Sequence, residues 1–330
     1  MAGIVQWWEQ RQVALFLAAM ALGALVGALA PGTAPALSLT ITPVLGLLLF
    51  ATFLGVPLVA AGRSFFDLRF LGGVLTVNFV IVPVVVFGLS RFVAADRALL
   101  LGVLLVLLTP CVDYVIVFTG LAGGARDKLL AATPLLMLLQ IVLLPGYLWL
   151  FAGPGAVALI EVGPFAEAFL LLIVLPLAAA AAVQFGRRGR RTARTARAIE
   201  TLMQALMVPL MMVTLAVVVG SQIAAVGAQA AALLAVIPLY VAFLAIMVGV
   251  GLLAARLVRL DVPASRALVF CGATRNSLVV LPLALALPAP LGLAPLAVVT
   301  QTLVELVGMV ILVRLVPRLV PGPRSGASRP

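Results

Sequence analysis

The chain has 330 residues, of which 65% are hydrophobic and only 9% are charged. Soluble globular domains carry roughly 45–50% apolar and about 25% charged residues, so the composition excludes a water-soluble domain. It also excludes intrinsic disorder, which needs low hydrophobicity. The chain has no histidine, which removes histidine metal ligands, general bases and proton relays. We therefore expect an all-α integral membrane protein with no metal, no cofactor and no nucleic-acid partner.

Apolar runs long enough to cross a bilayer, about 20 residues, occur ten times along the chain. They predict ten transmembrane helices at residues 13–30, 38–61, 68–90, 98–120, 129–152, 165–185, 200–221, 229–255, 264–287 and 294–316. The first five span residues 13–152 and the second five span 165–316, with an extracytoplasmic loop at 153–164 between them. Residues 1–12 and 317–330 are the two ends, and 186–198 is a basic loop.

Basic residues are distributed unevenly between the two sides of these spans. Of the 21 Lys and Arg residues, 18 lie at the chain ends or in alternate gaps, whereas only Arg91 and Arg97 lie on the opposite side. Cytoplasmic loops carry the excess of Lys and Arg, so we expect both termini in the cytoplasm and a multi-pass protein of the inner (plasma) membrane. The basic run at 186–198 could bind anionic lipid or a partner, but a plain cytoplasmic loop explains it.

The two halves of the chain share unusual features at a constant offset. Moving along by 166 residues places Pro43 on Pro209 and places Thr109-Pro110-Cys111 on Arg275-Asn276-Ser277. Because each half has an odd number of spans, a duplicated half would insert upside down. The pattern thus predicts a 5+5 inverted repeat, an arrangement common in secondary transporters.

The matched positions interrupt two spans, the fourth and the ninth. Pro110 kinks the span at 98–120, and a polar run, Gly272 to Ser277, interrupts the span at 264–287. Unwound backbone is tolerated in a membrane only where protein or a water-filled cavity surrounds it, so we expect the broken helices to cross at one central substrate site. The candidate substrate-binding residues are Thr109, Cys111, Asn276, Ser277 and Asn78, with Gln140 as a secondary candidate.

Three charged residues lie at membrane depth, where each costs roughly 2.5–3.5 kcal/mol. Asp113 and Arg275 are expected to form an ion pair between the crossing helices, and its role, structural or functional, stays open. Glu305 has no basic partner in its own span before Arg314. It is a candidate for proton coupling, together with Asp113, or else it makes a hydrogen bond to a neighbouring helix.

The two cysteines receive different interpretations. Cys111 follows the proline of the fourth span, so a functional role is expected for its thiol. Cys271 lies in an apolar run, where a buried cysteine usually acts as a small hydrophobic residue.

Three segments resemble a known family, the arsenical-resistance permeases of the wider bile acid:sodium symporter superfamily. The run from Pro110 to Phe118, closed by Gly120-Leu121-Ala122, resembles their fourth-helix signature with its essential cysteine. The run from Leu303 to Val307 resembles their tenth-helix motif with its essential glutamate, and 267–270 followed by Asn276 resembles their ninth helix. The resemblance implies the same ten-helix architecture, with Cys111 and Glu305 as functional residues.

The chain departs from these relatives at the crossing. Asp113 replaces a small residue, and Leu278 stands near the place of a second glutamate. Sodium-coupled relatives have an acidic residue and a Gln-Asn-Ser at the ninth-helix break, where this chain has Cys271 and Arg275-Asn276-Ser277. A fixed guanidinium would repel a sodium ion, so we expect no sodium coupling.

The leading hypothesis is a secondary carrier that exports arsenite, and by the same chemistry antimonite, in exchange for protons. Arsenite is mostly neutral As(OH)3 near neutral pH, and its soft arsenic suits the thiol of Cys111. The alternative is a carrier of small organic anions, such as bile-acid-like or carboxylate metabolites, that contacts them through Arg275. A channel or receptor needs no inverted repeat, a P-loop is absent, and no enzymatic constellation is present. Oligomeric state and stoichiometry stay open.

Overall fold

The computed structural model describes residues 2–55, 67–112, 114–153, 167, 170–187, 189 and 192–322. Nearly all of these residues are helical, and none of them belongs to a strand. Six helical stretches are long and apolar enough to cross a membrane: Pro31–Gly55, Leu68–Val93, Arg126–Ala152, Ala193–Ala228, Ala230–Val258 and Leu293–Leu319. The chain is therefore a multi-pass helical membrane protein, as its composition predicts.

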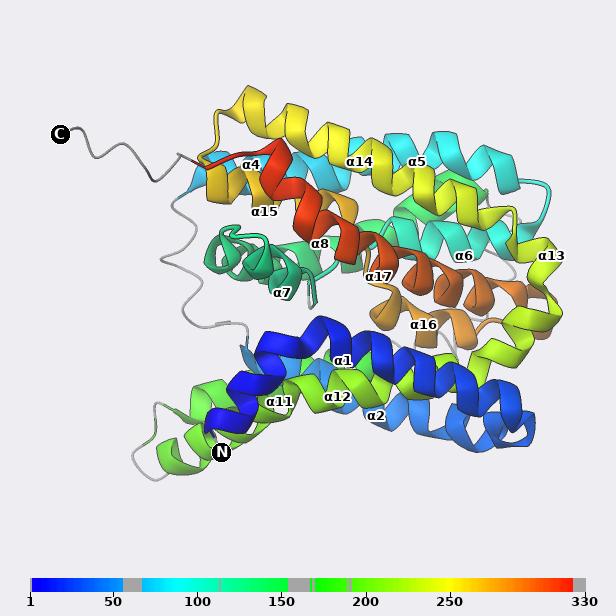
Figure 1. Ribbon diagram of the computed structural model, residues 1–330, viewed down its shortest axis with the longest axis horizontal. Coiled ribbons are helices and arrows are strands. Elements are labelled where there is room, and N and C mark those ends of the chain that lie inside the picture. Colours follow the sequence, from blue (N-terminus) through cyan, green and yellow to red (C-terminus); the bar gives the residue numbers. More distant parts are fainter. Residues whose placement is uncertain are drawn as a thin grey trace.

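The helices form two layers, one below the other in Figure 1. In the first layer α1 packs along α12, and α12 packs in turn on α2, which also contacts α11. The members of this layer are α1 (Ala2–Leu29), α2 (Ala34–Gly55), α11 (Leu175–Gly186) and α12 (Ala193–Ala228). Two short helices, η1 (Pro31–Thr33) and the π-helix η4 (Leu170–Val174), adjoin them.

The second layer holds the remaining helices, among which α14 packs on α15 and α6 packs on α17. Its α-helices are α4 (Leu68–Thr76), α5 (Val82–Ser90), α6 (Arg97–Leu107), α7 (Tyr114–Leu121), α8 (Arg126–Ala152), α13 (Ala230–Leu233), α14 (Val236–Val258), α15 (Val262–Ala273), α16 (Ser277–Leu285) and α17 (Leu293–Leu319). The short helices are η2 (Val77–Ile81, a π-helix), η3 (Arg91–Val93) and η5 (Ala289–Leu291).

Described helices coincide with each predicted span, although several of them differ in their bounds. Helix α1 already begins at Ala2, and α12 runs from Ala193 to Ala228 instead of over 200–221. The second half of the predicted loop at 186–198 is therefore the first turns of α12, and α17 continues to Leu319. Residues 154–166, nearly all of the loop predicted at 153–164, lie outside the described residues, as does the tail from 323. The 5+5 inverted repeat stays a prediction.

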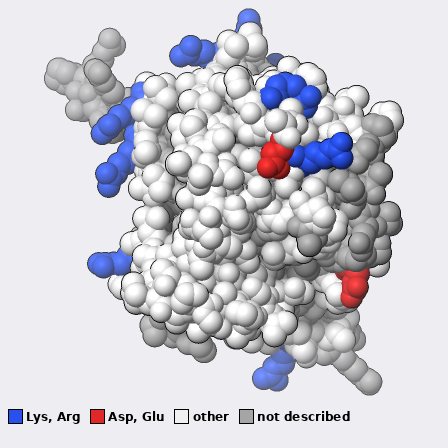
Figure 2. Space-filling model, turned by 90° about the vertical axis from the view of Figure 1, so that its right-hand side faces the viewer, with Lys and Arg blue, Asp and Glu red and all other residues white. Residues whose placement is uncertain are grey.

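The long axis of the molecule follows most of its helices. Helix α1 begins and α17 ends at the same end, on the left of Figure 1. Figure 2 looks at the opposite end, where most of the visible surface is uncharged and the Lys, Arg, Asp and Glu side chains are few. This arrangement fits a protein whose long axis crosses the bilayer.

Two helices of the second layer are interrupted, and the interruptions contact one another. The chain unwinds between α6 and α7 and again between α15 and α16. Pro110 pairs with Arg275 in an isolated antiparallel bridge. The Asn276 amide donates to the Thr109 carbonyl at 2.8 Å, and the Cys111 amide donates to the Thr274 carbonyl at 3.4 Å. Each break thus supplies hydrogen-bond partners for the other, as unwound backbone in a membrane requires.

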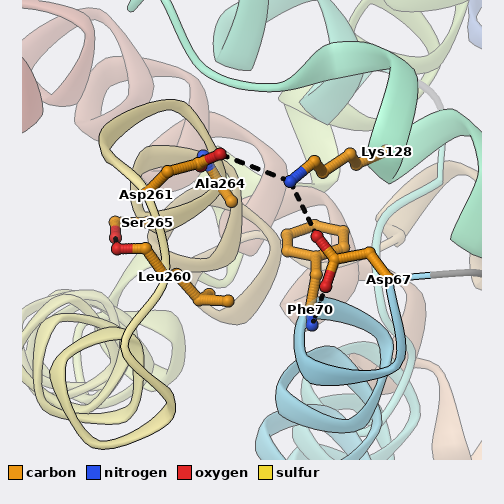
Figure 3. A network of polar contacts seen from close by, with 7 residues as sticks. All are labelled: Asp67, Phe70, Lys128, Leu260, Asp261, Ala264 and Ser265. Atoms are coloured by element: carbon orange, nitrogen blue, oxygen red, sulfur yellow. Dashed lines mark hydrogen bonds and ion pairs between the residues drawn. The ribbon is translucent and has the colours of Figure 1, made fainter.

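A small ionic network fixes the position of α15, the first half of the second interrupted helix (Figure 3). Asp67 caps α4, because its Oδ1 accepts from the Phe70 amide at 3.0 Å, and Asp261 caps α15 in the same way. Lys128 Nζ, in the first turn of α8, lies 2.7 Å from Asp67 and 3.5 Å from Asp261. The hydrogen bond from Lys128, and next that from Phe70, hold the pKa of Asp67 below its usual range.

Two glycines allow α1 and α12 to touch backbone to backbone. The Gly23-x-x-x-Gly27 pair predicts close helix packing, and the structure confirms it. A Cβ atom on Gly23 would lie 2.3 Å from the Ala216 carbonyl oxygen, and one on Gly27 would lie 2.2 Å from the Gly220 carbonyl oxygen. The contact between these two helices is therefore possible only without side chains at both positions.

We predict that Gly23→Ala and Gly27→Ala each destabilise the protein by about 1–3 kcal/mol, because the added methyl group forces the two backbones apart. The melting temperature of the detergent-solubilised protein measures this. Gly249→Ala in α14 is the matched control, since nothing lies within 4 Å of a Cβ built there. Equal melting temperatures for all three variants would contradict the close packing.

We further predict that the contribution of Asp67 to stability depends on pH. A carboxyl group with a lowered pKa in the folded state stabilises the protein at neutral pH and loses that effect as the pH falls below about 4. Because both partners are partly exposed, Asp67→Asn should cost less than about 1 kcal/mol at pH 7 and nothing in acid. Thermal melts of the parent and the Asp67→Asn variant at pH 7 and in acid measure this difference in stability, with Asp127→Asn as the control. A cost that is the same at both pH values would contradict the prediction.

Candidate functional site

The centre of the crossing is occupied by a fully buried guanidinium group. Arg275 Nη2 donates to Asn78 Oδ1 at 2.9 Å and to the carbonyl oxygens of Gly272 at 2.6 Å and Cys271 at 3.1 Å. Its Nη1 reaches the Leu107 carbonyl at 3.5 Å. The guanidinium carbon also lies 5.4 Å from the ring centre of Phe243, in a cation–π contact. Backbone from both interrupted helices therefore contacts this one side chain.

The local sequence explains why an arginine sits there. The last carbonyl groups of a helix have no intrahelical donor, and the helix dipole places partial negative charge at that end. Arg275 follows the end of α15 by two residues, so its side chain can fold back and donate to these carbonyls. The Arg275 guanidinium is thereby stabilised by backbone carbonyls at the end of α15.

Asp113, the expected partner of Arg275, lies outside the described residues. The predicted ion pair therefore stays a prediction. The only acidic group that the described residues bring to the crossing is Glu305 of α17.

Glu305 is buried and accepts hydrogen bonds from three groups. The backbone amide of Arg275 donates to its Oε2 at 2.8 Å, and the hydroxyl of Tyr114 donates to its Oε1 at 2.6 Å. Gln301, one turn earlier on α17, donates to Oε2 as well. The contact with Tyr114 of α7 is the hydrogen bond to a neighbouring helix that the sequence left open. It links the carboxyl group to both helix breaks.

Three neighbouring polar groups at the second break have no partner among the described residues. They are Arg275 Nε, Asn276 Nδ2 and Ser277 Oγ, and all three residues are fully buried. Asn276 already caps α16, because its Oδ1 accepts from the Val279 amide at 3.2 Å. Buried donors without acceptors cost free energy, so these groups suit a ligand that carries oxygen acceptors.

The other predicted site residues are unequally placed. Cys111 and Thr109 lie in the first break, and their backbone groups pair with the second. Asn78 lies in the π-helix η2 and donates to the Cys271 Sγ at 3.4 Å, so Cys271 belongs to the polar crossing and not only to the apolar core. No hydrogen bond joins Gln140 to the crossing within the described ranges, although Gln140 is buried.

Proline chemistry explains the widened turn that carries Asn78. Pro83 has no amide hydrogen and its ring crowds the carbonyl four residues earlier, which is that of Phe79. The helix adopts a π turn there, and the freed Phe79 carbonyl accepts from the Tyr147 hydroxyl at 2.6 Å. The turn at Asn78 is thus held by a specific hydrogen bond from α8.

Tyr114, Gln301 and Phe243 are functional candidates that sequence reasoning missed. Tyr114 is one of only three tyrosines and directly follows the first break. Gln301 precedes Glu305 by one helical turn. The sequence positions of Tyr114 and Gln301 could have indicated their roles. The role of Phe243 follows only from the tertiary contact between α14 and the guanidinium.

Small cavities flank the crossing. One of about 10 Å³, room for about a single water, is lined by Leu107, Tyr240, Phe243, Gln301 and Glu305 among others. A second, of about 40 Å³, lies between the layers, where Tyr114 faces Phe16 of α1 and Met207 and Met211 of α12. Tyr114 therefore stands between the inter-layer crevice and Glu305.

Residues 42–229 match the sequence model of the Sodium Bile acid symporter family. The chain belongs to the Sodium Bile acid symporter family. No curated protein matches the chain. Members of this family are transporters, so the crossing belongs to a symporter-like transporter of a small molecule in the lipid bilayer. The matched region contains the first break and ends before the second, and it does not single out the arsenical-resistance branch.

We predict that Arg275→Ala destabilises this symporter-family protein by at least about 3 kcal/mol, because Asn78 Oδ1 and the carbonyls of Cys271 and Gly272 lose their donor and each unsatisfied acceptor costs roughly 1–3 kcal/mol. The melting temperature measures the loss. Arg275→Lys should recover part of it, and Arg314→Ala on the exposed face of α17 is the control. An Arg275→Ala protein as stable as its parent would contradict the network.

Proposed function

We propose that this chain is a secondary active transporter that exports arsenite, and antimonite by the same chemistry, in exchange for protons. The substrate site is the crossing of the two breaks, with Cys111, Thr109, Asn276, Ser277 and Asn78 as binding residues. The observation that carries the proposal is that one crossing holds a thiol and three buried polar groups that have no partner within the described part of the chain. The oxygens of As(OH)3 suit the polar groups and its soft arsenic suits a thiol.

The thiol belongs to Cys111, and its position supports a reversible contact. The Cys111 amide pairs with the Thr274 carbonyl, which places this residue opposite the second break and beside Arg275. Cys271 lies one turn before Arg275, and its carbonyl contacts the guanidinium. Both interrupted helices thus contribute a cysteine to the crossing, and a cargo held by one or two sulfur ligands can be released when the helices separate.

Proton coupling is assigned to Glu305, with Asp113 as a second candidate. Glu305 is bonded to the backbone of the second break and to Tyr114 of the first interrupted helix. Gaining or losing a proton changes which of these groups it can accept from. A carboxyl group in this position can therefore bias the crossing between two arrangements, which is what an antiporter requires.

Sodium is not the coupling ion in this proposal. A sodium ion needs several oxygen ligands, and the Arg275 guanidinium already takes the carbonyl oxygens at the end of α15 and the amide oxygen of Asn78 in η2. The fixed positive charge also opposes a second cation nearby. The positive charge of Arg275 thus interacts with the carbonyl oxygens that a bound cation would otherwise coordinate at this place.

The topology that we propose has ten membrane crossings in a 5+5 inverted repeat, with both termini in the cytoplasm of a cell inner membrane. The bias of Lys and Arg supports it. The start of α1 and the end of α17 lie at the same end of the molecule (Figure 1), which fits an even number of crossings.

A carrier of small organic anions is the second candidate function. Two observations favour it: the Arg275 Nε has no partner among the described residues, and α16 begins at the crossing with its amide groups and positive dipole end. Half-helices of secondary transporters direct such ends toward anionic substrates. The cargo would then be a carboxylate or a bile acid.

Transport into everted membrane vesicles separates the two candidates. We predict that a pH gradient, and not a sodium gradient, drives arsenite uptake. Cys111→Ser should lower it at least about 10-fold, the ratio that 1.4 kcal/mol of lost affinity produces. Glu305→Gln should keep arsenite binding but lose the response to the pH gradient. Glu200→Gln, on the first turns of α12, is the control.

Two outcomes would count against arsenite. If Cys111→Ser vesicles take up arsenite as the parent does, the thiol is not a ligand. Uptake of taurocholate in place of arsenite would establish the organic-anion alternative. A strict sodium requirement at constant pH would contradict the role given to Arg275.

A further inference from the structure

We infer that Tyr114 is a positioning residue that transmits the protonation state of Glu305 to the backbone of the second helix break. The inference rests on the proposed role of Glu305 as the coupling carboxyl group. Tyr114 would do this by moving its single hydroxyl proton between two acceptors, the Glu305 carboxylate and the Arg275 carbonyl oxygen.

The geometry offers that choice directly. The Tyr114 hydroxyl oxygen lies 2.6 Å from Glu305 Oε1 and 2.9 Å from the Arg275 carbonyl oxygen. A phenol has one proton to donate, so it cannot satisfy both acceptors at once. When Glu305 is ionised, the charged oxygen is the stronger acceptor and takes the proton.

The position of an added proton on Glu305 follows from its other contacts. Oε2 already accepts from the Arg275 amide at 2.8 Å and from Gln301. A proton therefore goes to Oε1, the oxygen that faces Tyr114. The carboxylic O–H then donates to the Tyr114 oxygen, and the Tyr114 O–H turns to the Arg275 carbonyl. Apart from the added proton, only the hydroxyl proton of Tyr114 has to move.

This carbonyl belongs to the bridge between the two breaks. Arg275 is the residue that pairs with Pro110, and its amide is also bound to Glu305. The peptide groups on both sides of Arg275 thus sense the carboxyl group, one directly and one through Tyr114. Protonation of Glu305 adds a hydrogen bond from Tyr114 to the Arg275 carbonyl and weakens the hydrogen bond from the Arg275 amide to Glu305. The two peptide groups at the break are therefore affected in opposite directions.

Tyr114 is also the member of this network that reaches the space between the layers. It lines the crevice of about 40 Å³ beside Phe16, Met207 and Met211, and its ring packs edge-on against Phe118 at 6.3 Å. A solute or water entering this crevice meets the same side chain that holds Glu305. Through Tyr114 the network therefore borders the inter-layer crevice, whereas Glu305 does not line it.

Few other ionisable groups face Glu305 within the described residues. Tyr240 of α14 lines the same 10 Å³ cavity but donates to the Ala297 carbonyl at 3.0 Å and not to the carboxyl group. Helix α16 has no ionisable residue, and the ionisable residues of α6 and α12 lie in their first turns. Among the residues that the structure describes, the ionisable side chains around the crossing are Cys111, Tyr114, Tyr240, Cys271, Arg275 and Glu305.

Infrared difference spectra of the purified full-length protein between acidic and neutral pH test the inference without any transport. The wild-type spectrum should contain a carboxyl band, identified by its absence from Glu305→Gln, and a tyrosine C–OH band with the same pH midpoint. Tyr114→Phe should remove the tyrosine band and move the carboxyl midpoint by about one pH unit, since a hydrogen bond to a charged group is worth about 1.5–3 kcal/mol. Tyr240→Phe should change neither band, because its hydroxyl meets a carbonyl only.

Ring-deuterated tyrosine in the wild-type chain identifies the tyrosine band even if Tyr114→Phe does not fold. A pH-driven arsenite transporter whose difference spectrum lacks a tyrosine band would overturn this inference and leave the proposed function in place. Both bands in a protein that does not move arsenite would keep the inference and reject the cargo. A tyrosine band that survives in Tyr114→Phe or disappears in Tyr240→Phe would also overturn it.

Discussion

Backbone amide and carbonyl groups without hydrogen-bond partners are very costly inside a membrane. The structure therefore depends on the hydrogen bonds between its two helix breaks. Pro110 and the polar run after Gly272 each open a helix in the middle of an apolar layer. Each opening would leave several amide and carbonyl groups without partners. The antiparallel bridge between Pro110 and Arg275 lets the openings satisfy one another.

The charged groups at the crossing follow from the same constraint. The carbonyls at the end of α15 still need donors, and the Arg275 side chain provides them. The Arg275 amide needs an acceptor, and Glu305 provides it. The side chain of Arg275 therefore binds the end of α15, while its backbone amide binds Glu305 on α17. A change in the protonation of Glu305 acts on Arg275 through this backbone amide. A buried charge that is hydrogen-bonded in this way can be kept without the large cost of an isolated ion.

The two layers of helices do not contribute equally to the crossing. The second layer contains both interrupted helices and Glu305, whereas the first layer faces them across the crevice near Tyr114. The crossing residues are fully buried, so a solute reaches them only when helices move. If the proposed inverted repeat holds, rigid-body movement of one set of helices against another is the way in which such a transporter opens its site to either side. The ionic network at Lys128 holds α4, α8 and α15 together at one end.

The amino-acid sequence by itself determined that the protein is a multi-pass helical membrane protein and where two of its helices break, because apolar length, proline and clustered polar residues act locally. It also identified Asp113, Arg275 and Glu305 as charged groups that a membrane would not bury without cause, and Asn78 and Cys111 as candidate site residues. It did not determine their partners. The tertiary structure decided that Glu305 meets Tyr114 and the Arg275 amide, and that Cys271 meets Asn78. These contacts join residues as much as 193 positions apart. Helix crossing geometry, which no local pattern encodes, is the physical reason that only the folded chain could set them.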